Sequence, residues 1–491
     1  MSNRLRNRLR KFHKRKVSHM FFEKLNDAFN GFINLGGSAM MFIIITILSL
    51  IVGVSISKAI EGGLRMAIAL TGMGAIISLL TTAFSPALNS FVESTGVALS
   101  VTDLGWAPLA VITWGSVYTL YFAFICLLVN VFMLIAKKTT TLNVDLFNIW
   151  NLSVIGLLTM YYSNDNLILT TLFVAFIYAL MLINADVMKP TINELLGYDQ
   201  NNITTTAHPS LLIAPLVMVL NKFIDICLPF IDKFDFNAEA LNKKIGFWGS
   251  NFAIGAYLGI FIGILGQLSV AEIFTLAFTG AVALELFALV GSWFGPAIGP
   301  LSEGITSKMS KRFKGRKLLI GIDWPILATR AELWAVANIL APILLLVAIF
   351  LPGNTVLPLG GILLTVLAPA LLIVTKGRVV RMTIIGTILI PLFLWGATFI
   401  AKFVTETSKA MGNFPNGLDA DSLFSSVDSD PIEKMLAILF GKAVDTWDIK
   451  LIGFSVLALI AYILLFGWYF KQMRKENKKM ELKQNTDKKV S

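Results

Sequence analysis

Residues 321–361 form an apolar run with a polar break at each end, and this stretch constrains the fold most strongly. It reads GIDWPILATRAELWAVANILAPILLLVAIFLPGNTVLPLGG, with Asp323 in the first break and Asn354 in the second. The apolar part has about the 20 residues that a bilayer core requires. Arg330 and Glu332 lie at its start, although a charge at the membrane centre costs at least ~2.5–3.5 kcal/mol. We therefore expect a membrane transporter that binds a solute at this depth.

The composition excludes a large soluble protein. Of 491 residues, 56% are hydrophobic and only 14% are charged, whereas soluble domains carry about 25% charged residues. So few polar side chains would not cover a globule of this size. We predict an all-α polytopic membrane protein with ten to twelve transmembrane helices, some of them broken or re-entrant.

Several kinds of chemistry find no support in the sequence. Cys126 and Cys227 are the only cysteines, lie in apolar surroundings and form no CxxC pattern, and the chain has only three histidines. Neither a disulfide framework nor a metal site is predicted. A glycine-rich phosphate loop is also missing. We expect no metal, no cofactor and no ATP-driven transport by this chain alone.

The positive charge, +11 in total, gathers at the two ends of the chain. Residues 1–35 form a basic arm and residues 471–491 a basic tail, both flanking the predicted membrane domain, 36–470. The positive-inside rule places both termini in the cytoplasm, with the basic ends on anionic lipids. Nucleic-acid binding is the weaker explanation of these charges. The more acidic segment 402–448 is predicted to be an extracytoplasmic loop.

Two polar stretches interrupt the first half of the chain. Residues 101–114, VTDLGWAPLAVITW, are too short and too broken to cross a membrane, and are expected to be re-entrant or unwound. In LNVDLFNIWN, the side chains of Asp145, Asn148 and Asn151 are spaced i, i+3, i+6 and share roughly one helix face. They mark either a ligand-binding face or an N-terminal cap beside an interfacial tryptophan.

The breaks suggest two pseudo-repeated halves. A lysine-containing stretch precedes NVDLFNIW, and another precedes IGIDWPILA; LGWAP at 104–108 is broken like LPGNTVLPLGG at 351–361. Interrupted segments in corresponding halves point to a transporter site at the midplane. We therefore interpret residues 321–361 as the second-half counterpart of residues 104–151.

This organisation predicts a set of substrate ligands. Asp145, Asn148, Asp323 and Asn354 are expected to converge, with freed backbone groups, on a small polar solute. Trp106 and the other tryptophans of the breaks would stack on the carbon face of a sugar or polyol, or would instead anchor the protein at the membrane interface.

Other polar residues are candidates on weaker patterns. His208 precedes a proline at the mouth of a membrane segment, where it is either a ligand or a structural histidine. Glu303 lies in GSWFGPAIGPLSEG (residues 291–304), which resembles a discontinuous helix, and is a candidate for binding or proton chemistry. Arg330 and Glu332, two positions apart, would point in different directions on a helix. At least one of them is expected to be a packing or domain-interface partner.

The motifs resemble one family when they are taken in order. LRMAIALTGMG, DLGWAP, NVDLFNIWN, the Thr-Ala-His-Pro step, IGPLSEG, LLIGID and PGNTVLPLGG cover roughly residues 36–400. This series is similar to enzyme IIC, the membrane component of the bacterial phosphotransferase system (PTS), of galactitol type, a relative of the ascorbate type. The resemblance implies a permease (EIIC) in the cell membrane that binds a carbohydrate outside. A core domain would carry it across by moving against a dimerising scaffold domain.

The resemblance also implies partners. A IIB subunit (EIIB), phosphorylated on cysteine and charged by a IIA subunit (EIIA), would phosphorylate the substrate. The chain would be the membrane subunit of a sugar phosphotransferase complex without a phosphorylated residue of its own, because Cys126 lies in a predicted span. Asn151 and Gly361 stand where galactitol-type proteins tend to have histidine and aspartate. The substrate is thus galactitol or another polyol or sugar.

An alternative function keeps the same architecture. A secondary transporter driven by protons or sodium would use the carboxylates of Glu303, Asp323 or Asp145 for coupling. It would accumulate unmodified solute rather than a phosphorylated product.

Overall fold

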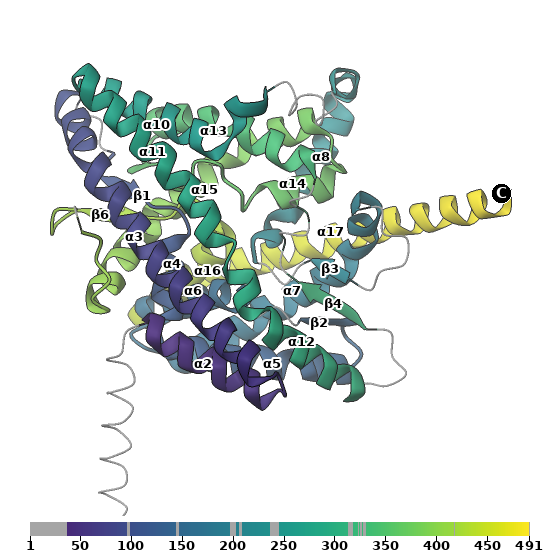
Figure 1. The fold of residues 1–491 in the computed structure, drawn as a ribbon. Helices are drawn as coiled ribbons and strands as arrows, with labels where there is room; N and C mark the ends of the chain where they lie inside the picture. Colours follow the sequence, from purple (N-terminus) through teal and green to yellow (C-terminus); the bar gives the residue numbers. More distant parts are fainter. Residues whose placement is uncertain are drawn as a thin grey trace, which may run out of the picture.

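A computed structural model gives the fold of the chain (Figure 1). It describes residues 37–95, 99–143, 147–196, 203–205, 209–235, 245–312, 318–322, 324, 327, 330–416 and 418–490. Seven of the described helices are long and apolar enough to cross a membrane, and three more are apolar but shorter. The prediction of an all-α polytopic membrane protein is confirmed, whereas the number of full crossings stays a prediction.

The first half of the chain is helical with three short strands. Its elements are α2 (Gly37–Ile51), α3 (Ile56–Thr95), β1 (Val101–Asp103), α4 (Ala107–Trp114), α5 (Tyr118–Ile135), β2 (Thr141–Asn143), α6 (Phe147–Tyr162), α7 (Leu167–Leu196), β3 (Ile203–Thr205), η1 (Pro209–Ile213), α8 (Ala214–Cys227) and η2 (Pro229–Phe234).

The second half repeats this order. Its elements are η3 (Gly246–Gly249), α10 (Asn251–Leu265), α11 (Val270–Gly291), α12 (Phe294–Arg312), β4 (Leu319–Ile322), α13 (Ala331–Phe350), β5 (Val356–Leu357), α14 (Ala368–Thr375), α15 (Val379–Ala410), β6 (Leu423–Ser425), α16 (Pro431–Thr446) and α17 (Ile449–Val490). In this correspondence α10 matches α2, α11 and α12 together match the long α3, and α13 matches α5. Helix α17 has no counterpart among the described residues of the first half; it packs on α16, α7 and α8, and its C-terminal part extends away from the other helices in Figure 1.

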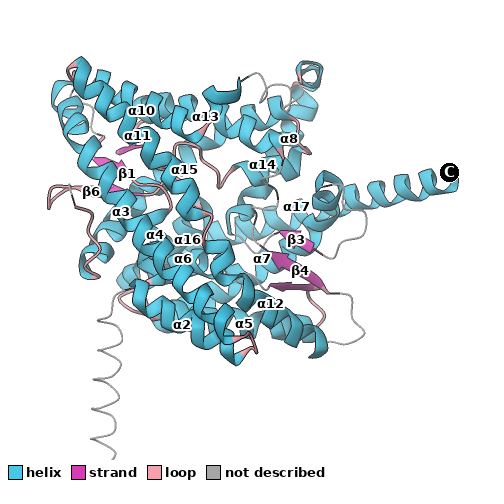
Figure 2. Ribbon diagram, in the orientation of Figure 1, coloured by secondary structure: helices cyan, strands magenta, loops and turns pink. Residues whose placement is uncertain are grey.

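The described strands form two small parallel sheets, drawn in magenta in Figure 2. The first sheet has the order β5-β1-β6 and the second the order β2-β4-β3. In each sheet the central strand comes from one half of the chain and both flanking strands come from the other. Segments next to the polar breaks of the two halves therefore pair in both sheets, and the convergence of their side chains on one solute stays a prediction.

The pairing of the breaks differs from the predicted equivalence in one respect. β2 lies beside β4 and β1 lies beside β5, so the motifs matched in the sequence are neighbours in space. The order of elements, in contrast, makes β1 equivalent to β4 and β2 equivalent to β5. Motifs can match between halves because they are neighbours in a sheet or because they hold the same place in the repeat. Comparison of the sequences of the two halves does not distinguish these two reasons.

Helices α2, α3, α10, α11 and α12 pack against one another. Small residues permit the closest of these contacts. A Cβ at Gly255 of α10 would lie 2.2 Å from the carbonyl oxygen of Gly280 of α11, and one at Gly259 would lie 2.4 Å from the oxygen of Leu276. Such backbone approach is typical of helix packing inside membranes.

One segment differs from the sequence expectation in its secondary structure, and another agrees with it. Residues 402–448, predicted to be an extracytoplasmic loop, contain the end of α15, strand β6 and helix α16, which packs on α6, α15 and α17. The side of the membrane that this segment faces stays a prediction. The expected interruption of the helix in residues 291–304 is present: α11 ends at Gly291 and α12 begins at Phe294, after which α12 continues through Pro300 to Glu303 and beyond.

The pair Arg330 and Glu332 also differs from expectation. Arg330 has an extended backbone and precedes α13 rather than lying in it. The two side chains therefore turn toward each other: Arg330 Nη2 lies 2.6 Å from Glu332 Oε1, and Nε lies 3.1 Å from Oε2. Arg330 Nη1 also donates to the carbonyl of Leu195 at the end of α7 (2.9 Å). The pair has the packing role that was predicted for at least one member.

Candidate functional site

The first sheet is closed by the carboxylate of Asp103. Its Oδ1 accepts hydrogen bonds from the backbone N–H groups of Gly105 (3.0 Å) and Val427 (2.8 Å). Its Oδ2 accepts from those of Leu359 (3.0 Å) and Gly361 (2.7 Å). Burial raises the pKa of Asp103, and the four donors act in the opposite direction. All four contacts are donors, which suits the ionised form. The segments that leave β1, β5 and β6 are thus tied together.

Two glycines make this closure possible. Gly105 has a φ of +66°, and a Cβ on it would lie 2.9 Å from the carbonyl of Gly360. The Gly360 N–H donates to the carbonyl of Asp103 at 3.1 Å. The glycines of DLGWAP and VLPLGG therefore allow the two backbone segments to come into close contact. The Asp-x-Gly pattern of the first motif was the available signal for Asp103, which the sequence reasoning did not include among the site residues.

Strand β6 leads into a buried charged segment. Asp428 Oδ1 accepts from the Val366 N–H (2.9 Å), and its Oδ2 accepts from the Thr365 hydroxyl (3.0 Å). Burial, with the nearby charges of Asp103 and Asp430, raises the pKa of Asp428 to about 6. Further on, Lys434 Nζ lies 3.6 Å from Asp430 Oδ2, and both side chains are almost fully buried.

The strands of the second sheet end at one edge, and three predicted site residues follow these strands in the sequence. Its strands are parallel, with Asn143 opposite Gly321 and Thr205 opposite Ile322, so β2, β4 and β3 end at the same edge. In the sequence, Asp145 follows β2, Asp323 follows β4 and His208 follows β3. These three residues themselves lie outside the described residues.

Polar side chains inside the helices hold this second sheet. Asn130 of α5 donates through Nδ2 to the carbonyl of Thr141 (2.8 Å), and its Oδ1 accepts from the Asn143 N–H (3.0 Å). The Asn143 amide donates to the Tyr178 hydroxyl (3.0 Å), and Asp186 of α7 accepts from the Thr141 hydroxyl (2.8 Å). These polar groups orient strand β2.

Trp106 lies between α4 and α6, the helix that follows β2. Its half-buried ring is 5.9 Å from that of Trp150, measured between centroids, with the planes 39° apart. Asn148 belongs to the first turn of α6, although its side chain lies outside the described part of the chain. Asn151, one turn further, is buried.

Asn354 and Glu303 lie elsewhere. The Asn354 amide donates to the carbonyls of Ala348 and Val356 (both 2.8 Å), and its oxygen accepts from the Val356 N–H (3.1 Å) and the Thr398 hydroxyl (3.2 Å). It thereby supports β5 in the first sheet. Glu303 is exposed on α12, which packs on α2 and α3. A ligand role for either residue stays a prediction.

A hydroxyl-rich cavity of about 260 Å³ adjoins the first sheet. Ser38, Thr71, Ser408 and the amide of Asn413 line it, together with the ring of Phe414. Its size and lining suit a small polar solute. Among the residues that the structure describes, no group of three or more His, Cys, Asp or Glu side chains is arranged to hold a metal ion.

Comparisons with known proteins agree on one family. The model of the EIIC-GAT family, described as PTS system sugar-specific permease component, matches residues 31–417. The galactitol-specific EIIC component of the PTS from Escherichia coli K12 is 27% identical over 414 residues, covering 83% of this chain and 89% of the relative. A putative permease IIC component from the same strain is 28% identical over 382 residues, covering 77% and 86%.

Proposed function

Because this chain belongs to the family of sugar-specific permease components of the PTS, we propose that it binds its carbohydrate at the edge of the second sheet. The protein is a multi-pass membrane permease, and its family works with EIIB and EIIA subunits. One observation carries the location of the site: three parallel strands, drawn from both halves, end at this edge and lead to Asp145, Asp323 and His208.

The residue types at this edge suit a polyhydroxylated substrate. Carboxylates of Asp145 and Asp323 accept hydrogen bonds from hydroxyl groups, and the imidazole of His208 both donates and accepts. Asn148 adds an amide at the start of α6. The Trp106 ring offers an apolar face to the carbon backbone of a sugar or polyol. Strand ends from both halves would change together when the halves move, which suits alternating access.

The substrate proposed is galactitol or another polyol or sugar. The name of one relative, the galactitol-specific component, supports this class. The chain would supply binding and passage, and the phosphoryl group would come from phosphocysteine on EIIB. A core domain would carry the site past a scaffold domain that dimerises. Both termini would face the cytoplasm, with their basic residues on anionic lipids.

Uptake by proteoliposomes tests this function. Vesicles containing the purified protein are given labelled galactitol outside, with EIIA, EIIB and a phosphoryl donor inside. We expect labelled phosphorylated product in the lumen only when phosphorylated EIIB is present. Accumulation of unmodified solute that collapses with an ionophore would instead support an ion-coupled secondary transporter.

A ligand screen identifies the substrate. A specific ligand stabilises the state that it binds, so it raises the thermal unfolding temperature of the purified protein. We expect a shift with one polyol or sugar from a panel that includes galactitol and its stereoisomers. The absence of a shift with every carbohydrate, at concentrations up to 100 mM, would contradict the proposal.

A further inference from the structure

We propose that a charged cavity at the junction of α7, α8, α14 and α17 is the docking site of the phosphorylated EIIB subunit. This inference rests on the proposed function. The cavity has a volume of about 400 Å³. Its lining includes four basic side chains from three separate elements: Lys222 of α8, Lys376 and Arg378 of the α14–α15 turn, and Lys479 of α17.

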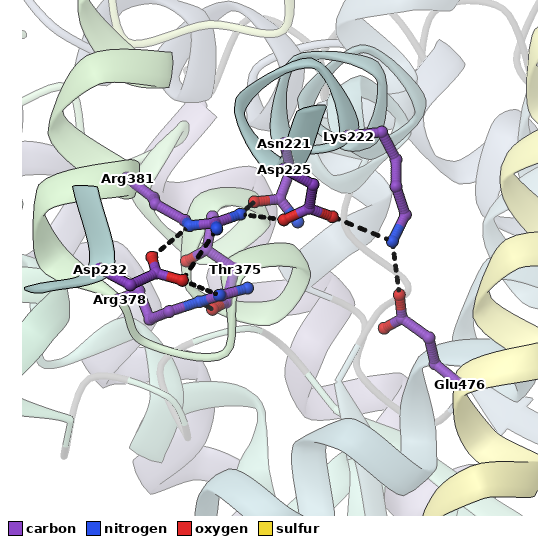
Figure 3. Close-up of polar contacts among 8 residues, drawn as sticks. All are labelled: Asn221, Lys222, Asp225, Asp232, Thr375, Arg378, Arg381 and Glu476. Atoms are coloured by element: carbon purple, nitrogen blue, oxygen red, sulfur yellow. Dashed lines mark hydrogen bonds and ion pairs between the residues drawn. The ribbon is translucent and has the colours of Figure 1, made fainter. Parts of the chain in front are cut away.

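A network of hydrogen bonds and ion pairs centred on Arg381 lies next to the cavity and shares Asn221 and Asp225 with its lining (Figure 3). The side chain of Arg381 is only 3% exposed and joins three elements. Its Nη1 donates to Asp225 (2.5 Å) and Asn221 (3.0 Å) of α8, and its Nε and Nη2 donate to Asp232 of η2 (2.5 and 2.9 Å). A fixed guanidinium with satisfied donors holds α8, η2 and α15 in one arrangement. The basic groups of the cavity therefore lie next to a hydrogen-bonded network that fixes these three elements.

Two of the basic groups, Lys222 and Lys376, form partly exposed ion pairs. Lys222 Nζ lies 3.3 Å from Asp225 and 3.4 Å from Glu476 of α17, and Lys376 Nζ lies 3.2 Å from Glu194 of α7. The side chains of Lys222 and Lys376 are 37% and 35% exposed, so these ion pairs contribute little to stability. A phosphoryl group brings a charge of about −1.5 to −2 and three acceptor oxygens. It can therefore replace carboxylates as the partner of these cations.

The cavity lies on the side where EIIB is expected. Helix α17 continues from it into the basic tail, 471–490, and the turn that carries Lys376 and Arg378 is also basic. By the positive-inside rule both belong to the cytoplasmic side. A soluble phosphoprotein reaches the membrane protein from that side only.

The cavity also adjoins the segment that follows β4. Arg330, eight positions after β4 ends at Ile322, donates to the carbonyl of Leu195, the neighbour of Glu194. Its partner Glu332 packs on Gly377, where a Cβ would lie 3.6 Å from the carboxyl group. One layer of ion-paired side chains thus separates the docking cavity from the chain that leaves the proposed substrate edge. Phosphate donor and substrate would approach each other through this layer.

Charge reversal tests the inference. In the complete protein, reconstituted with galactitol as substrate, the rate of substrate phosphorylation is measured against the concentration of phosphorylated EIIB. We expect Lys376→Glu and Lys479→Glu each to raise the half-saturating EIIB concentration at least tenfold at low salt. Substrate affinity, measured by calorimetry without EIIB, is expected to change less than twofold. Both lysines are exposed, so the variants should fold.

Lys402→Glu is the matched control. It reverses an exposed lysine of the same helix as Arg381, paired with Glu406, and lies 24 residues from Arg378, or about 36 Å along the helix. We expect its half-saturating EIIB concentration to equal that of the wild type. A photo-crosslinking residue at position 479, but not one at position 402, should capture EIIB.

Three outcomes overturn the docking inference. The first is an unchanged half-saturating concentration in both variants while substrate still binds. The second is an equal effect of Lys402→Glu. The third is an effect seen only in vesicles with anionic lipid and absent in detergent, which would assign the cavity to lipid headgroups. Failure of the proposed function looks different, because then no carbohydrate binds to the wild-type protein.

Discussion

The two sheets share one topology but differ at their open edges. In the first sheet, the carboxylate of Asp103 accepts four backbone hydrogen bonds and draws together the segments that follow β1, β5 and β6. In the second, a network from Asn130 and Asp186 fixes β2 from the side. Its strands lead to Asp145, Asp323 and His208. The same sheet topology thus has a structural role in the first sheet and holds the proposed substrate site in the second.

This difference suggests that the two sheets of the repeated fold have different roles, one structural and one in binding. A carboxylate that accepts four backbone donors has little capacity left for a solute, whereas a strand edge held from the side leaves its polar residues for binding. Asp103 is the last residue of the central strand β1, and Asp323 comes directly after the central strand β4 in the sequence. We expect substitution of Asp103 to lower stability and substitution of Asp323 to lower substrate affinity.

The largest effect is expected for Asp103→Asn. The amide group would face two buried N–H donors, so two hydrogen bonds to a charged group, worth about 1.5–3 kcal/mol each, would be lost. We expect unfolding to become easier by about 3–6 kcal/mol, with little inserted protein recovered. Denaturation in detergent measures this, and Asp419→Asn, at an exposed position, is the control. A variant as stable as the wild type would show that the four hydrogen bonds to Asp103 do not contribute to stability.

Asp323→Asn should act on binding instead. We expect carbohydrate affinity to fall at least 100-fold in calorimetry, because a charged acceptor for hydroxyl groups is lost, with stability within about 1 kcal/mol of the wild type. A loss of stability like that of Asp103→Asn would mean that both sheets are closed in the same way. The proposed division between them would then be wrong.

Asn354→Ala tests whether the Asn354 side chain is a substrate ligand or a structural amide. Four hydrogen bonds end on this side chain, and its removal leaves the Val356 N–H and two carbonyls without their partner. We expect a loss of about 2 kcal/mol in stability and a change in affinity below threefold. Thr398→Val, which removes one of the four contacts, should lose about half as much. A tenfold loss of affinity at normal stability would restore Asn354 as a ligand.

The smallest effect concerns pH and the first sheet. The pKa of Asp428 is about 6 in the fold, above its ordinary value of 3.8, because burial disfavours the charged form. A raised carboxyl pKa stabilises the fold below the ordinary value, and this stabilisation is lost as the pH rises through about 6. We expect about 1 kcal/mol, because Asp428 is only partly buried and water screens part of the effect. Thermal unfolding at pH 5 and pH 7 measures it, and Asp428→Asn should reduce the difference.

The membrane class and the meeting of the breaks were predictable because they depend on local patterns. Long apolar runs reveal spans wherever they occur, and proline and glycine mark the interruptions. Asp103 was not predictable as a closure, because Leu359 and Val427, two of its donors, follow it by more than 250 positions. Nor does the sequence separate the buried Glu433 and Lys434 of α16 from the exposed charges near them, so residues 402–448 were interpreted as a loop.

The site was predictable in part. The sequence predicted, from paired broken segments, that Asp145, Asn148, Asp323 and Asn354 converge on a solute, and this stays a prediction. The structure adds that β2, β4 and β3, which precede Asp145, Asp323 and His208 in the sequence, end at one edge. Asn354 was chosen because it is polar and lies in a break, but its amide is engaged with β5 and Thr398. Polarity indicates that a side chain needs partners. It does not indicate whether those partners are backbone groups or a solute.

The exchange of strands between halves has a consequence for biosynthesis. β4 is the centre of the second sheet, yet Leu319 follows the end of β3 at Thr205 by 114 positions. At ribosomal rates of 5–20 residues per second, β2 and β3 wait on the order of ten seconds for the strand that joins them. The second sheet therefore forms late in translation. A ribosome pause or truncation before residue 322 therefore leaves inserted helices without the proposed binding edge.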